Sequence, residues 1–242
     1  AAIGVSALGS NTTGARNLAI GYRAYDNADE ENDNIAIGYD ALGGAIAGGE
    51  QNIAIGNYSL DANTTGDNNS AVGHNALSAN TTGAGNTASG AYALYTNTTG
   101  DYNSAFGINS LKVSEGGDNN TALGWNSLYT NTSGANNTAI GSEAGDVITT
   151  GGSNVIIGSG SDPSANDASN QIVLGYGATG HGDNIGVIGN TDMTAWHPAD
   201  DNGVDLGSSS YEFKNLYVDG VAYTDAIGFG TVTMTLPTAD GS

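Results

Sequence analysis

Asn137-Thr138-Ala139-Ile140-Gly141 recurs, with small changes, along most of this chain. Close copies occupy residues 34–38, 52–56 and 120–124. The glycines that close the copies are 17 residues apart, except for one step of 18 residues. They are Gly4, Gly21, Gly38, Gly56, Gly73, Gly90, Gly107, Gly124, Gly141, Gly158 and Gly175. A fixed period sustained over so many steps predicts a solenoid, in which each repeat forms one coil.

Alignment on these glycines produces three apolar columns. The residue before the glycine is usually Ile, Val or Leu, the residue before that is usually Ala, and the fourth residue after the glycine is usually Leu. Because neighbouring side chains of a strand point to opposite faces, the first two columns cannot share a side. We predict two short strands per coil, with the isoleucine and leucine columns filling its interior. The alanine column then forms a face that is closely approached, and a neighbouring chain is the simplest candidate.

The side of the coil away from the glycines carries an Asn-Thr-Thr-Gly turn, as in residues 63–66 and 80–83. Asn and Gly tolerate the left-handed backbone that such turns require. The Asn that opens each repeat is predicted to stack on its equivalents, with the amides in hydrogen-bonding reach across about 4.8 Å. The Gly, Asn and Thr content and the lack of a 3.6-residue period exclude helices. The predicted fold is therefore all-β, a parallel β-solenoid on the order of 50 Å long.

The chain carries a net charge of −21 with only four cationic side chains, and it contains no cysteine. Such a negative field repels nucleic acid and anionic membrane surfaces, so neither is an expected partner. No apolar run approaches the roughly 18 residues needed to span a bilayer, so membrane insertion is not expected.

Two regions are predicted from the change in composition. Residues 1–190 form the repeat solenoid, and residues 191–242 form a β-rich connecting segment with short strands in 204–220 and 231–237. Because the chain opens in the middle of a repeat, we expect it to be a fragment of a longer protein.

The residues just after each glycine vary, and several are aromatic. Variable amphipathic side chains in an otherwise constant repeat indicate positions that face outward, where aromatic rings can stack on sugars. The alternative interpretation is that these rings merely shield the edge of the coil. The candidate glycan-binding residues are Tyr22, Tyr39, Tyr58, Tyr92 and Trp125.

Other side chains offer little sign of catalysis or metal binding. His74, His181 and His197 are isolated in sequence, which favours surface or packing roles over zinc or catalytic roles. The acidic run at residues 26–33 suggests calcium or a solvated loop, and it lacks the regular spacing of a calcium loop. The repeat supplies Asn, Thr, Gly and apolar residues rather than an acid–base pair. We therefore expect no cofactor, no metal and no enzymatic activity.

The repeat, as in residues 137–141 and 86–94, resembles the head repeats of trimeric autotransporter adhesins. Those repeats form a left-handed parallel β-roll of three chains side by side, so the resemblance implies a homotrimer. The variant with Asn-Thr-Thr-Gly turns also resembles repeats in bacteriophage tail fibres. Residues 205–218 and 236–242 resemble segments common in the same fibres, which favours the phage.

The resemblance implies a structural fibre of a phage tail that presents a trimeric rod for host-cell attachment. The expected location is the virion, with other virion tail proteins and a host surface glycan or protein receptor as partners. The alternative is the head of a bacterial trimeric autotransporter adhesin, located on the cell surface. A third possibility is an ice-binding solenoid, suggested by stacked threonines such as Thr65 and Thr82.

Overall fold

The computed structural model describes residues 1–27, 30–44, 48–196, 210, 211 and 213. The chain divides into two compact units, Ala1–Thr194 and Ala195–Ser242. Apart from three residues, the strands predicted in 204–220 and 231–237 lie outside the described part, and the acidic run at 26–33 lies partly outside it. The boundary at residue 190 stays a prediction.

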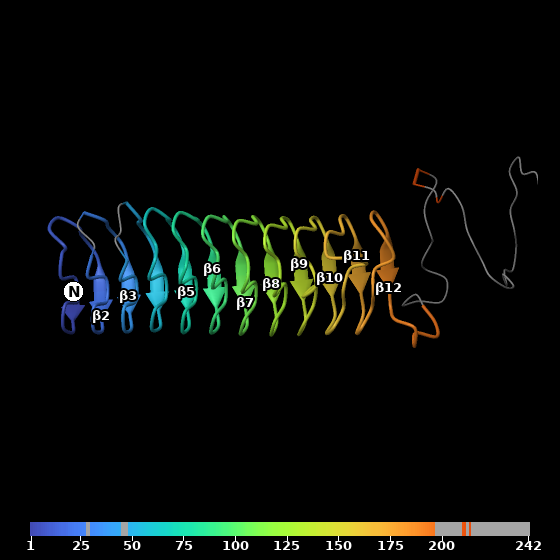
Figure 1. Ribbon diagram of the computed structural model, residues 1–242, viewed down its shortest axis with the longest axis horizontal. Helices are drawn as coiled ribbons and strands as arrows, with labels where there is room; N and C mark the ends of the chain where they lie inside the picture. The colour runs from blue at the N-terminus through green and yellow to red at the C-terminus, as the bar shows by residue number, and fades with distance from the viewer. Residues whose placement is uncertain (28–29, 45–47, 197–209, 212, 214–242) are drawn as a thin grey trace, which may run out of the picture. The chain divides into compact units, whose positions relative to one another are not determined.

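One parallel sheet organises the first unit, and each of its twelve described strands pairs with the next strand in the chain (Figure 1). The arrows in Figure 1 all point the same way because one coil separates each strand from the next. This arrangement is an all-β parallel β-solenoid, as predicted. The strands are β1 (Ala2–Ile3), β2 (Leu18–Ile20), β3 (Ile35–Ile37), β4 (Ile53–Ile55), β5 (Ser70–Val72), β6 (Thr87–Ser89), β7 (Ser104–Phe106), β8 (Thr121–Leu123), β9 (Thr138–Ile140), β10 (Val155–Ile157), β11 (Ile172–Leu174) and β12 (Gly186–Ile188).

The prediction of two strands per coil is wrong, because each described coil contains one strand. The side opposite the sheet is a series of turns in which the leucines adopt a left-handed backbone, as Leu77 does with φ 51°. Backbone hydrogen bonds still join these turns from coil to coil, for example from Leu77 N–H to Ala93 O at 3.0 Å. Left-handed residues interrupt the extended geometry of a strand, so these turns stack without forming a second sheet.

The interior of the coil contains the alanine and leucine columns. Ala105, Ala122, Leu111 and Leu128 are all 0% exposed and belong to one continuous core. The prediction that the alanine column faces a neighbouring chain is therefore wrong. The leucines from the turn side fill the narrow interior, so only a methyl group fits opposite them on the strand.

The isoleucine column, predicted to lie inside, points to solvent. Together with the first residue of each strand it forms what we call the outer sheet face. Leu123, for example, is 49% exposed. Ser89 interrupts this column without burying its hydroxyl, because its position is outward. The exposed large residues of the column are Ile3, Ile55, Val72, Phe106, Leu123, Ile140, Ile157 and Ile188.

The predicted asparagine stack is confirmed inside the coil. The backbone N–H of Asn120 donates to Oδ1 of Asn103 at 2.9 Å, and Nδ2 of Asn103 donates to Gly117 O at 2.7 Å. Both asparagines are fully buried. Each amide thus satisfies two backbone groups in the turn that leads into the next strand, which explains why one Asn is needed in every repeat.

The periodic glycines end the strands where successive backbones come closest. Gly124 has φ 147°, and a Cβ atom built on it would overlap the carbonyl oxygen of Gly141 in the next coil. Both the backbone angle and the close approach exclude a larger side chain at this position.

Candidate binding surface: an aromatic track

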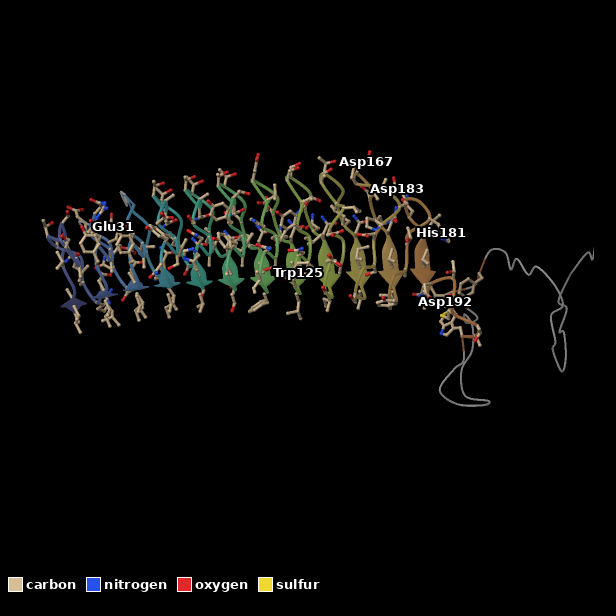
Figure 2. The ribbon with its side chains drawn as sticks, turned by 60° about the horizontal axis from the view of Figure 1, so that its bottom comes forward. Glu31, Trp125, Asp167, His181, Asp183 and Asp192 are labelled. Carbon is tan, nitrogen blue, oxygen red and sulfur yellow. The ribbon has the colours of Figure 1, made fainter. Side chains whose placement is uncertain are left out.

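The outward turn after each strand presents the candidate glycan-binding residues. Tyr22, Tyr39, Tyr58 and Trp125 are between 37% and 48% exposed, and Tyr92 is half-buried. In Figure 2, Trp125 lies by the tips of the strand arrows, whereas Asp167 and Asp183 lie at the loops on the other side of the coils. The expected outward placement is therefore observed, and Trp125 is separated from those two carboxylates.

Ring contacts join the first of these residues from coil to coil. Tyr22 stacks on Tyr39 with centroids 5.2 Å apart, and Tyr39 meets Tyr58 edge-on at 5.3 Å. His74 continues the row, with its ring 6.2 Å from Tyr58 and 5.4 Å from Tyr92. Edge-to-face and offset contacts at these distances are favourable arrangements of aromatic rings.

A lysine extends the row beyond the last ring contact. Tyr92 meets Tyr95 in the same coil at 5.6 Å. Lys112 Nζ then lies 5.3 Å from the centroid of Tyr92 and 5.5 Å from that of Tyr129, so two rings share one cation. Within the described part of the chain, no carboxylate lies at ion-pair distance from Lys112.

These contacts define one continuous surface, which we call the aromatic track. It crosses seven consecutive coils, from the turn after β2 to the turn after β8. Its members are Tyr22, Tyr39, Tyr58, His74, Tyr92, Tyr95, Lys112 and Tyr129.

Sequence reasoning found half of this surface. It placed Tyr22, Tyr39, Tyr58 and Tyr92 outward, but it considered His74 isolated. It also missed Tyr95, Lys112 and Tyr129, although they share one column at the fifth residue after the glycine. Inspection of that column would have found them. Trp125 has no ring contact with the track in the described structure.

Charged groups flank the beginning of the track. Arg23 Nε lies 2.8 Å from Asp26 Oδ2 and 3.4 Å from Asp40 Oδ1, so its charge is already balanced. The neighbouring charge of Asp40 raises the pKa of Tyr39, with desolvation adding to the effect. The Tyr39 phenol is therefore neutral at physiological pH and can donate or accept a hydrogen bond.

Titratable groups with displaced pKa values also occur away from the track. Burial, with a contribution from Asp146, raises the pKa of Asp162 to about 6. Burial likewise raises the pKa of Asp146, and Glu143 adds to it. Among the described residues no group of three or more His, Cys, Asp or Glu side chains could hold a metal ion. None of the described residues forms a helix long and apolar enough to cross a membrane.

A depression of about 380 Å³ lies at the last coil. Thr179, His181, Ile188 and Asn190 are among the residues that line it. The described lining offers one imidazole and no carboxylate partner, so it provides no acid–base pair of the kind that hydrolysis requires.

No protein-family model matches this chain, and no curated protein matches its sequence. Its function must therefore be argued from the outer sheet face and the aromatic track.

Proposed function

We propose that this chain is the repetitive rod of a homotrimeric phage tail fibre, which presents its surface for attachment to a host cell. The observation that carries the proposal is the outer sheet face, on which every described strand except β6 presents at least one apolar side chain outward. Contiguous apolar patches of this extent mark interaction surfaces on soluble proteins. Copies of the same rod are the partner that matches it in length and spacing.

The distribution of charge supports assembly through this face. The sequence has 25 Asp and Glu residues, but none of the described strands contains a charged residue. Rods with a net charge of −21 repel each other, so close association needs a surface free of carboxylates. The outer sheet face meets that need, and it replaces the alanine column as the proposed interface. The number of three copies comes from the resemblance to trimeric fibres and adhesin heads.

The remaining surface suits a passive structural role. The Asn and backbone groups are used in coil-to-coil hydrogen bonds, and the proposed fibre has no catalytic activity. The head of a bacterial trimeric adhesin is the second candidate, because the observed register of the Asn-x-Ala-Ile-Gly repeat supports it equally. The sequences that flank this chain in its gene would separate the two candidates.

Light scattering of the purified chain tests the assembly. We expect the mass of three chains, and we expect the double substitution Phe106→Asp and Leu123→Asp to reduce that mass, because both side chains lie on the outer sheet face. Tyr102→Asp is the matched control, since Tyr102 is 66% exposed but lies outside that face. Circular dichroism shows whether each variant remains folded. A folded wild-type monomer would contradict the proposal, as would a trimer that survives both strand substitutions.

A further inference from the structure

We propose that the aromatic track binds an extended, neutral polysaccharide whose sugar units follow successive coils. This inference rests on the proposed role in attachment and selects a glycan over a protein receptor. Its occupant is a linear chain of pyranose units, because the track is narrow and passes from each coil to the next.

The spacing of the track matches a repeating polymer. Adjacent coils are hydrogen-bonded, and the ring centroids follow one another at 5.2 to 6.2 Å. A pyranose unit in an extended chain advances by a similar length, so successive sugars meet successive rings. Each contact is weak, but contacts linked along one polymer raise the effective concentration of the next, so affinity increases with chain length.

The chemistry of the track fits a sugar with apolar and polar edges. The C–H faces of a pyranose pack against aromatic rings, and phenol and amide groups can hydrogen-bond to its hydroxyls. Asn75 lies beside the track, with its Nδ2 at 2.9 Å from His74 Nε2. A protein receptor instead favours a broad, well-packed apolar centre, which this single row of half-exposed rings does not provide.

Charge selects among glycans. The chain has a net charge of −21, and Asp26 and Asp40 stand at the start of the track. Such a surface repels anionic polymers. Arg23 is neutralised by its ion pairs, which leaves Lys112, held between two rings, as a single positive charge. One cation on seven coils does not reverse the overall preference for an uncharged chain.

The fold itself does not require these rings. The coils after β9 and β10 carry Ser142, Glu143, Ser159 and Gly160 in the corresponding positions, and their strands keep the same pairing. If aromatic rings were needed for one coil to stack on the next, they would also occur in the coils after β9 and β10. The restriction of the track to seven coils thus points to a ligand.

Calorimetric titration of the full chain with defined hexasaccharides tests this inference. The neutral probes are β-1,4-linked glucose, β-1,4-linked mannose and α-1,4-linked glucose hexamers, and the anionic probe is a hexamer of mannuronic acid. We expect at least one neutral hexamer to bind, and to bind at least tenfold more tightly than its dimer. We expect Tyr39→Ala with Tyr58→Ala to weaken that binding at least tenfold at an unchanged melting temperature.

Tyr102→Ala is the control, because Tyr102 is an exposed ring outside the track, resting over Gly85. It should leave the affinity unchanged. Absence of binding by every neutral hexamer, preference for the mannuronic acid hexamer, or binding that survives loss of Tyr39 and Tyr58 would each overturn the inference. A trimer by light scattering that binds no hexamer would leave the fibre proposal intact and remove only the ligand class. A folded monomer would contradict the fibre whatever the glycan result.

Discussion

Asn103 shows how single residues hold the coils together. Its Oδ1 accepts from both the backbone N–H and Nδ2 of Asn120, at 2.9 and 3.1 Å. Its own N–H donates to Asn86 Oδ1 at 2.9 Å. The second asparagine stack, in the Asn-Thr-Thr-Gly turns, is less complete. Asn97 donates to Asn80 Oδ1 at 3.0 Å, but Ser114 follows in the next coil, and both Asn97 Oδ1 and Ser114 Oγ lack a partner in the described structure.

Ser114→Asn should therefore stabilise the protein. The backbone N–H of Ser114 donates to Leu111 O at 3.3 Å, and the backbone N–H of Asn97 donates to Leu94 O at 3.2 Å. Because the two backbones make the same contact, we expect an asparagine to fit at position 114 without rearrangement. The new amide would donate to Asn97 Oδ1, and one satisfied buried acceptor is worth about 1 kcal/mol. Urea denaturation at fixed protein concentration measures the gain. Ser110→Asn is the control and should destabilise, because the Ser110 hydroxyl already donates to Gly107 O at 3.0 Å. A loss of stability in the Ser114 variant would contradict the argument.

The sequence predicted the coil, its period and the asparagine stack, because Gly and Asn have specific backbone roles. It did not predict which strand face is inside, since alternation defines two faces without saying which is buried. Residue size was the missing signal. In β10 and β11 the inward residue becomes Ile156 or Val173, and the leucine column changes there to Asp162 and Thr179. The strand residue becomes larger where the turn residue becomes smaller, so the alanine and leucine columns share one interior. The aromatic track was only half predicted, because its path moves between columns.

At the scale of the element, strand pairing is fixed while the turns vary. The coil between β3 and β4 has one extra residue, since Ile35 pairs with Ile53 rather than with a residue 17 positions away. The next coil returns to 17 residues, with Ile53 paired to Ser70. The additional residue is absorbed between the strands, so alternation of side chains along them is preserved.

Insertions should therefore have effects that depend on where they fall. One Gly inserted after Gly116, in a turn, should lower the free energy of unfolding by less than about 1 kcal/mol. One Gly inserted between Thr121 and Ala122 should lower it by about 3 kcal/mol or more, because it moves the leucine to the position of Gly124, where a Cβ atom overlaps Gly141 O. Chemical denaturation followed by circular dichroism compares the two variants. Equal losses would show that the turn is as restrictive as the strand.

At the scale of the whole molecule, burial of carboxyl groups in an acidic protein affects how its stability responds to pH. The pKa values of Asp61 and Asp146 are raised by burial, and that of Asp162 is raised to about 6. A raised pKa means that the folded state binds more protons than the unfolded state between the two pKa values. Stability contributed by the neutral acid is present below pH 4 and decreases as the pH rises to about 6.

Asp162→Asn should consequently raise stability at pH 7.5 by about 1 kcal/mol, a figure reduced for partial solvent screening. At pH 4 the variant should gain much less, because the wild-type carboxyl group is then mainly protonated in the folded state. Thermal unfolding at both pH values and at one protein concentration measures the difference. Asp167→Asn provides the comparison at an exposed carboxylate. An equal gain for Asp162→Asn at both pH values would contradict the assigned cause.

The first residues of the strands have a further consequence for the proposed side-by-side assembly. Aliphatic side chains occupy this column from β2 to β4 and in β10 and β11, and Ser or Thr occupies it from β5 to β9. Because the repeats are nearly identical, two copies could otherwise associate with one of them shifted by one coil along the other. If two copies were displaced by one coil, the Ile53 side chain of one copy would face the Ser70 hydroxyl of the other. The hydroxyl would then be removed from water without a hydrogen-bond partner, which is unfavourable. In the proposed assembly, the uneven column would therefore favour copies that are aligned end to end.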